Sequence, residues 1–192
     1  MSRVGHCDDA QSHRHDAHAV MSIAVRVRAA TADDVPAVTA IYNEGIRGRR
    51  ATFETAERVT EDVHPWLVGP HPFLVATATA TDATVIGWVR ASSYRARECY
   101  AGIGEFSVYV TASAQRQRVG DALLTAFIPA CSEAGLWKLV SRLFVDNAAS
   151  RALCARHGFR EVGTYERHAK LDGVWRDVLI VERLLPVAFD PA

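Results

Sequence analysis

The sequence has no excess charge of either sign and no long apolar run, and these absences narrow what the protein can do. Its 22 basic and 22 acidic residues cancel to a formal net charge of +0, so no overall field attracts nucleic acid or a membrane surface. No apolar run approaches the roughly 20 residues that span a bilayer. We therefore expect no nucleic-acid partner and no membrane association, and any anion binding must be local.

Cysteines are also few, and they show no paired spacing. They are Cys7, Cys99, Cys131 and Cys154. A chain of 192 residues can bury a full core without covalent staples, so reduced thiols and a cytoplasmic location are expected rather than disulfides.

The N-terminal residues lack apolar periodicity. Residues 1–22 are polar and carry His6, His13, His15 and His18, which predicts a disordered, histidine-rich leader rather than a metal site. We expect no metal, one folded domain over residues 23–186, and a C-terminal tail over residues 187–192.

The remaining chain alternates between strand and helix periodicity. Helices are predicted to follow Thr31, Thr60, Gly120 and Asn147, and Pro129 should kink the third helix or end it early. Strands are predicted over 23–27, 73–78, 85–91, 105–110, 138–145, 159–167 and 174–184, the last two joined by a turn at Asp172-Gly173. The order β-α-α-β-β-β-α-β-α-β-β predicts an α/β (α+β) fold: a central mixed sheet of about seven strands with helices on both faces.

The stretch from Gly104 to Leu124 organises this pattern. A strand with period-two alternation leads through a basic turn, ending at Gly120, into a helix. Free N–H groups and the helix dipole at such a joint favour an anion. An ordinary strand–turn–helix joint would have the same sequence pattern. The pattern alone therefore does not decide between an anion site and a plain structural joint.

Several local motifs resemble one family. The motifs are Ile41-Tyr-Asn, Ala51-Thr-Phe-Glu, Tyr94-Arg-Ala-Arg with Tyr100, Glu105-Phe-Ser-Val-Tyr-Val, Asn147-Ala-Ala-Ser, Gly158-Phe and Trp175-Arg-Asp. Together with the element order, they resemble the GNAT superfamily of acetyl-CoA-dependent N-acetyltransferases, and within it the phosphinothricin, methionine sulfoximine and arsinothricin acetyltransferase branch. The resemblance implies a GNAT fold, with a mostly antiparallel sheet splayed between its fourth and fifth strands, and a homodimer.

It also implies acetyl-CoA as co-substrate, with pyrophosphate on the amides of residues 115–120. The family's glycine-rich signature fits in two registers: the letters favour Gln117 as its first residue, and the spacing favours Gln115. The spacing register places Arg118 where a glycine is usual, which is strained if the turn requires positive φ. The implied cofactor-binding residues are Val108, Tyr109, Val110, Gln115, Arg116, Gln117, Arg118, Val119, Gly120, Asp121, Asn147 and Ser150. Asn147 is equally interpretable as a plain helix N-cap.

For catalysis, the resemblance points to Glu105, Tyr109 and Cys154. Glu105 is the candidate base, and backbone amides near Tyr109 would polarise the thioester carbonyl. Cys154 stands where family members carry a histidine or tyrosine beside the leaving thiolate, and a buried packing cysteine is the alternative.

The substrate-binding candidates are Phe53, Arg95, Arg97, Tyr100 and Glu105. Paired guanidinium groups suit carboxylate and phosphinate oxygens. We therefore expect acetyl transfer, by direct attack, to the α-amine of a small anionic amino-acid analogue. The alternatives are an acetyltransferase for another amine, such as a polyamine or a protein N-terminus, and a non-catalytic CoA-binding protein.

Overall fold

The computed structural model describes residues 24–78 and 84–186. The predicted leader, the start of the first predicted strand at Ile23, the turn after Ala78 and the predicted tail lie outside the described residues. The strands are β1 (Val25–Ala29), β2 (Phe73–Ala78), β3 (Val85–Ser93), β4 (Ile103–Val110), β5 (Lys138–Phe144), β6 (Arg160–Leu171) and β7 (Val174–Leu184). The helices are α1 (Val35–Arg47), α2 (Thr60–Val63), α3 (Val119–Glu133) and α4 (Ala148–Arg156). The predicted element order is confirmed.

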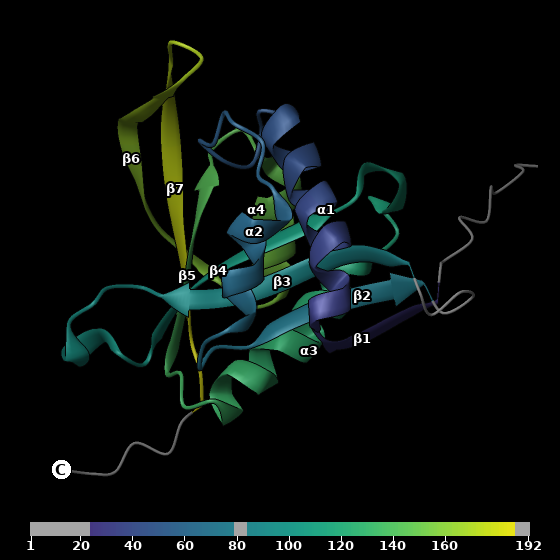
Figure 1. Ribbon diagram of the computed structural model, residues 1–192. Helices are drawn as coiled ribbons and strands as arrows, with labels where there is room; N and C mark the ends of the chain where they lie inside the picture. Colours follow the sequence, from purple (N-terminus) through teal and green to yellow (C-terminus); the bar gives the residue numbers. More distant parts are fainter. Residues whose placement is uncertain (1–23, 79–83, 187–192) are drawn as a thin grey trace, which may run out of the picture.

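The strands form one seven-stranded sheet in the order β1-β2-β3-β4-β5-β7-β6. Neighbours pair antiparallel throughout, except β4 and β5, which are parallel. The expected mixed, mostly antiparallel sheet is therefore confirmed. The paired strands β6 and β7 extend beyond the rest of the molecule as a long hairpin (Figure 1).

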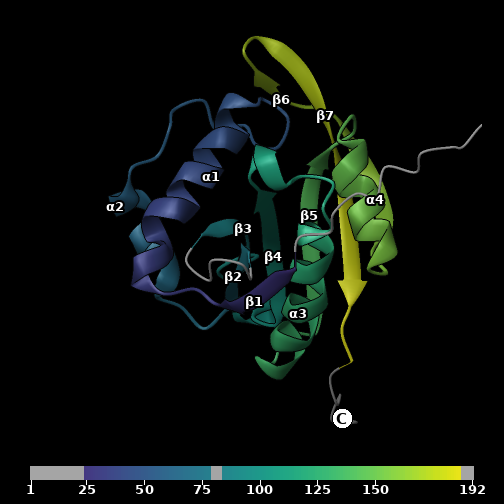
Figure 2. The same ribbon diagram turned by 90° about the vertical axis from the view of Figure 1, so that its right-hand side faces the viewer.

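Helices cover both faces of the sheet (Figure 2). On one face, α1 buries Val38 and Ile41 at helical spacing against Trp88 of β3. On the other face, α3 buries Leu123 and Phe127 in a larger core. Two separate apolar layers thus hold the sheet between them, as the predicted architecture requires.

Strands β4 and β5 stay together only at their beginnings. Their paired residues run from Ile103 to Glu105 on β4, whereas β3 accompanies β4 from Gly104 to Val110. Beyond the last ladder pair, the buried Ser141 hydroxyl of β5 donates to the Phe106 carbonyl at 2.9 Å. The expected splay between the fourth and fifth strands is confirmed, and it begins immediately after Glu105.

Two local predictions have different outcomes. Helix α3 does not end early at Pro129, because it continues to Glu133. The turn between β6 and β7 falls at Asp172-Gly173 as predicted, with φ of +49° and +80°. Positive φ at both central residues matches the right-handed twist of hairpin strands. Across residues 24–78 and 84–186, no helix is long and apolar enough to cross a membrane.

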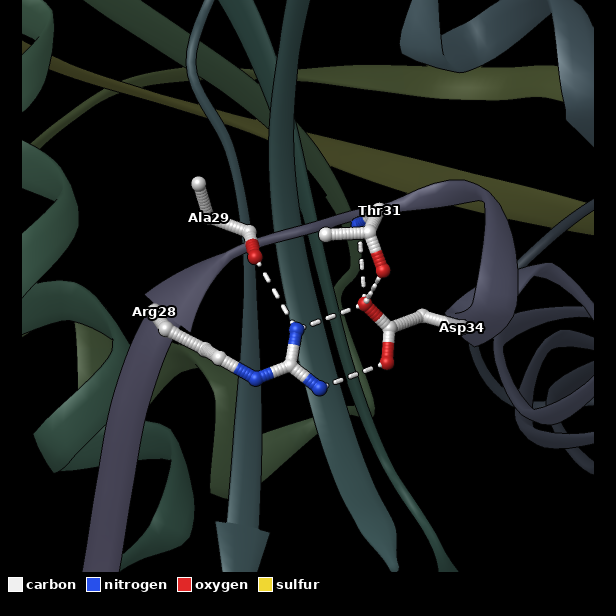
Figure 3. A network of polar contacts seen from close by, with 4 residues as sticks. All are labelled: Arg28, Ala29, Thr31 and Asp34. Carbon is white, nitrogen blue, oxygen red and sulfur yellow. Dashed lines mark hydrogen bonds and ion pairs between the residues drawn. The ribbon is translucent and has the colours of Figure 1, made fainter. Parts of the chain in front are cut away.

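A carboxylate-centred network fixes the start of α1 (Figure 3). Asp34 accepts two hydrogen bonds from the Arg28 guanidinium, at 2.7 and 2.8 Å. It also accepts from the backbone N–H and the hydroxyl of Thr31, at 2.8 and 3.0 Å. The hydrogen bonds from Arg28 contribute most to holding the pKa of this buried carboxyl below its usual range.

Replacing Asp34 with asparagine should lower the free energy of unfolding by about 2 kcal/mol at neutral pH, because Arg28 and Thr31 lose the carboxylate that binds them. Folding lowers the pKa of Asp34. The stability that its carboxylate contributes is therefore fully present above about pH 4, and it is lost as the pH falls through the pKa of the folded state. Urea unfolding of the wild type and Asp34→Asn should therefore converge at low pH.

The neighbouring exposed acid gives the control, because Asp33→Asn should change stability little. A difference between the wild type and Asp34→Asn that stays constant down to about pH 2.5 would contradict the charge-based explanation.

Candidate active site

The divergence of β4 from β5 opens a cleft in the sheet. Of the predicted site residues, it brings together Val108 and Tyr109 on β4 with Asn147, Ser150 and Cys154 at α4. The complete lining is Ala51, Phe106, Ser107, Val108, Tyr109, Ser141, Arg142, Leu143, Phe144, Asn147, Ser150 and Cys154.

Backbone groups of β4 face this cleft. Phe106 directs its carbonyl toward β5, where Ser141 binds it. Because backbone groups of a strand point alternately to its two sides, the N–H of Val108 also points toward the cleft, where β5 no longer pairs with it. An amide fixed in this way is a suitable donor for a ligand carbonyl or a developing oxyanion.

Glu105 lies where the two strands separate, and an arginine holds its carboxylate. Nη1 of Arg142, on β5, lies 2.8 Å from Oε1 of Glu105. The Glu105 side chain is 25% exposed and that of Arg142 is 41% exposed. The candidate base is thus mostly shielded from solvent and directly beside the cleft.

The Tyr109 ring packs into the aromatic cluster under α1. It stacks on Trp88, with ring centroids 4.8 Å apart, and meets Tyr42 edge-on at 5.1 Å. Gly45 of α1 makes room for it, since a Cβ there would lie 2.6 Å from the ring. Burial raises the pKa of the Tyr109 phenol, so the hydroxyl stays protonated at neutral pH.

Two hydrogen bonds draw the loop after α1 across the cleft. The Tyr109 hydroxyl donates to the Ala51 carbonyl at 3.3 Å, and the Asn147 amide donates to the Arg50 carbonyl at 3.2 Å. The Asn147 side-chain oxygen also accepts from Ser150 N–H at 3.1 Å, which caps α4. Asn147 is therefore both a helix cap and a cleft residue, so the two interpretations of the sequence are compatible.

The predicted phosphate turn contains two strained residues. Arg116 and Arg118 both have φ of +61°, a left-handed conformation that costs a non-glycine residue about 1 kcal/mol or more. The prediction of strain at Arg118 is thus confirmed. The first helical bond is from Ala122 N–H to the Arg118 carbonyl. Free N–H groups in a turn with left-handed residues form an anion-binding concavity.

Neighbouring elements hold this turn in place. Glu44 of α1 accepts hydrogen bonds from the Thr111 hydroxyl at 2.9 Å and from the Ala112 N–H at 2.8 Å, so it anchors the segment entering the turn. Gln117 donates to the Ser113 carbonyl at 2.9 Å, whereas Gln115 is exposed.

The first residues of α3 face α4 and the core. Val119 is buried, so only its backbone is available to a ligand. A Cβ on Gly120 would lie 3.0 Å from Leu153 of α4, so glycine permits this close helix contact. Asp121 pairs with Arg156 of α4 at 2.9 Å, which lowers its pKa and leaves its carboxylate engaged with α4.

Cys154 is buried among core residues at the cleft wall, and burial raises the pKa of its thiol to about 11. A free cysteine thiol has a pKa near 8.5. A thiol so much weaker as an acid has little driving force to protonate a departing thiolate. The packing role therefore has the stronger physical support, and the catalytic role stays a prediction.

The substrate candidates fall into two groups. Phe53 packs edge-on against Phe144 of the cleft, with ring centroids 4.8 Å apart. The arginines lie instead on the loop between β3 and β4: Arg95 and Arg97 are exposed, and Arg95 lies over the Tyr94 ring at 5.1 Å. That loop extends away from the sheet (Figure 1), and neither these arginines nor Tyr100 line the cleft.

Three residues at or near the site were not predicted from the sequence. They are Arg142, Glu44 and Arg90. Arg142 had a visible signal, since it is the one charged residue in the mostly apolar strand sequence Leu-Val-Ser-Arg-Leu-Phe-Val. Arg90 of β3 lies over the Trp66 ring at 4.7 Å, and its buried Nε has no hydrogen-bond partner among the described residues. Nothing local in the sequence marks Glu44 as the partner of Thr111.

The site thus combines a divergent parallel strand pair, a β4 amide that faces the gap and a turn with left-handed residues before α3. Residues 38–159 match the acetyltransferase (GNAT) family model. The chain therefore belongs to the GNAT acetyltransferase family, as its sequence motifs suggested.

Individual relatives agree with this assignment. The chain is 34% identical to a phosphinothricin N-acetyltransferase of Streptomyces coelicolor over 166 residues, which cover 84% of this chain and 96% of that protein. A Sinorhizobium meliloti phosphinothricin acetyltransferase, solved in complex with acetyl-CoA, is similar in structure, with a TM-score of 0.80, 26% identity, and coverage of 88% of this chain and 93% of that one. A Brucella melitensis ribosomal-protein-alanine N-acetyltransferase has a TM-score of 0.79 and 31% identity, and the similarity covers 83% of this chain and 99% of that one.

Substitutions at Arg118 test the strained turn. Arg118→Gly should leave the free energy of unfolding within about 1 kcal/mol of the wild type, because glycine relieves the left-handed strain but adds chain entropy to the unfolded state. Arg118→Val should destabilise by about 1–2 kcal/mol more than Arg118→Gly, because a β-branched residue fits this conformation worst. Chemical denaturation measures both.

Gln115 supplies the matched control in the same exposed turn. Its φ of −64° is in the extended region, so Gln115→Val should cost little. Equal losses for valine at positions 115 and 118 would show that backbone strain does not explain the effect.

Proposed function

We propose that this protein transfers an acetyl group from acetyl-CoA to the α-amine of a small anionic amino-acid analogue of the phosphinothricin type. The observation that carries the proposal is the position of Glu105 at the point where β4 leaves β5, beside a cleft lined by backbone and side chains of β4, β5 and α4. This places a carboxylate next to the opening in which an amine and a thioester could meet.

The cleft and the turn fit the two parts of acetyl-CoA. Pyrophosphate suits the amides at the start of α3, where Arg116 and Arg118 adopt left-handed conformations. The pantetheine arm suits the unpaired edge of β4, with Asn147 on the opposite wall. The relative solved with acetyl-CoA shares this fold, which supports the same donor here.

The proposed reaction is direct attack in a ternary complex. Glu105 binds the substrate ammonium and accepts its proton, directly or through water. The free amine attacks the thioester carbonyl, whose developing oxyanion is stabilised by the Val108 N–H. The new C–N bond forms, the C–S bond breaks, and CoA leaves as a thiolate that takes a proton from water. The described cleft shows no nucleophile–base pair of the kind that an acyl-enzyme would need.

The proposed substrate class rests on the relatives and on local charge. The similar Streptomyces protein is named for phosphinothricin. We keep Arg95, Arg97 and Tyr100 as proposed contacts for the substrate anion, because the Arg95 and Arg97 side chains are exposed and guanidinium groups suit carboxylate and phosphinate oxygens. The similarity to a ribosomal-protein-alanine acetyltransferase favours a protein N-terminus as the second candidate substrate.

A homodimer and a cytoplasmic location belong to the same proposal. The hairpin of β6 and β7 exposes Val162, Tyr165, Val174 and Trp175 along its length, each between 48% and 61% exposed, and exposed apolar groups on a projecting hairpin suit a contact with another chain. The cysteines that the structure describes are free thiols, as in a reducing compartment.

Glu105→Gln tests the proposed function. With phosphinothricin as acceptor, it should lower kcat by about 100-fold, because an amide cannot take up the ammonium proton. Acetyl-CoA affinity should change less than about threefold, since the carboxylate is on the acceptor side. Release of free CoA thiol measures turnover, and calorimetry measures acetyl-CoA binding.

Glu57→Gln is the matched control, because Glu57 forms an ion pair with Arg47 at the same 2.8 Å separation outside the cleft. It should retain wild-type turnover. Faster acetylation of spermidine or of a peptide N-terminus than of phosphinothricin would contradict the proposed substrate class. Unchanged kcat in Glu105→Gln from pH 6 to 9 would exclude Glu105 as the base.

A further inference from the structure

The proposed reaction uses Glu105 but leaves its partner Arg142 without a role. The two side chains project from adjacent strands on the same face of the sheet. On β5, Ser141 faces the opposite side, where its hydroxyl reaches Phe106, and alternation therefore places Arg142 on the Glu105 side. Their ion pair joins the two strands just beyond their last ladder pair, Glu105 and Val140.

Arg142 has unused binding capacity. A guanidinium carries five N–H donors in a planar fork. Among the described residues, the Arg142 side chain makes one hydrogen bond, from Nη1 to the Glu105 carboxylate. The side chain lines the cleft and is 41% exposed, so its remaining donors are accessible to a ligand anion.

A purely structural role explains the pair poorly. The Ser141 hydroxyl already bridges β5 to β4 at this level, and a partly exposed ion pair adds little stability. An arginine beside the base would also repel an ammonium substrate unless that substrate brought a negative charge of its own. The position thus suits a ligand with both charges close together.

An α-amino acid has this charge pattern, with ammonium and carboxylate on one carbon. We propose that Arg142 binds the α-carboxylate of the substrate while Glu105 binds its α-ammonium, so that the ion pair selects α-amino acids over simple amines. The four charges then alternate in sign around the site, and the bidentate geometry of guanidinium matches a carboxylate.

The surroundings support this assignment. Phe144 follows Arg142 on the same face of β5 and packs against Phe53, forming an apolar wall beside the pair. An anion held against such a wall is partly desolvated, which strengthens charge-assisted hydrogen bonds. The inference rests on the proposed function, because it assigns the acceptor subsite of the same reaction. It leaves the side-chain anion of the substrate to other residues, such as those of the loop between β3 and β4.

The test compares two ligands that differ only by the α-carboxylate: phosphinothricin and (3-aminopropyl)methylphosphinic acid. Calorimetry in the presence of CoA measures binding without turnover. The wild type should bind phosphinothricin at least about tenfold more tightly. Arg142→Gln should weaken phosphinothricin binding by about tenfold or more, the range expected for a lost charge-assisted pair, and should change binding of the decarboxylated amine less than about threefold.

Arg142→Lys should restore part of the preference, because it keeps the charge but loses the fork. Arg47→Gln, which breaks the matched ion pair outside the cleft, should leave both affinities unchanged. In turnover assays, the loss in Arg142→Gln should appear mainly in KM for phosphinothricin.

Equal losses for both ligands in Arg142→Gln would overturn the inference, because they would show that Arg142 acts by holding Glu105 or the strands. A wild type without preference for the α-carboxylate would overturn it as well. Carboxylate-dependent binding with no thiol release from acetyl-CoA would contradict the proposed function while supporting the assignment of Arg142.

Discussion

Strand β4 pairs with β3 as far as its own last residue, Val110, but it pairs with β5 only as far as Glu105. The site depends on this asymmetry. A strand released on one edge offers fixed backbone groups to a ligand, while its other edge holds it rigid. Ser141 satisfies the Phe106 carbonyl at the branch point, so the next group facing the gap is the Val108 amide.

The two faces of the sheet divide the chemistry between them. Odd-numbered residues of β4 direct Glu105 and Tyr109 toward α1 and the aromatic cluster, and even-numbered residues direct Phe106 and Val108 toward α3. In the proposed reaction the acceptor amine approaches on the first face, and the proposed pyrophosphate site is the turn before α3, which covers the second face. The strain at Arg116 and Arg118 is offset by anchors outside the turn, including Glu44 and the pairing of Asp121 with α4.

Much of this arrangement was predictable because it is local. Periodicity predicted the element order, and the spacing from Val110 to Gly120 predicted the strained position of Arg118, which is confirmed. The Arg142 partner of Glu105 was not predictable, because it depends on the parallel register of β4 and β5, which are far apart in sequence. The direction of the Arg95 loop also depends on tertiary placement. The predicted early end of α3 at Pro129 was wrong, because the helix continues to Glu133.

The packing of one aromatic cluster explains why this part of the fold can support such a site. Trp88 carries Tyr109 on one side and contacts Trp66 and Phe73 on others. The stacking of Tyr109 on Trp88 holds the end of β4 in place through its α1-facing side. This part of β4 therefore does not need to pair with β5 to stay ordered. Gly45 is required because α1 must approach the Tyr109 ring closely.

The most direct test of the central claim is amide hydrogen exchange with and without CoA. If the released edge of β4 and the strained turn form the cofactor site, CoA should slow exchange in residues 106–110 and 115–121 and at the start of α4, with little change in β1 and β2. Protection confined to segments away from the divergence of β4 and β5, or no protection at saturating CoA, would contradict the assignment of this cleft.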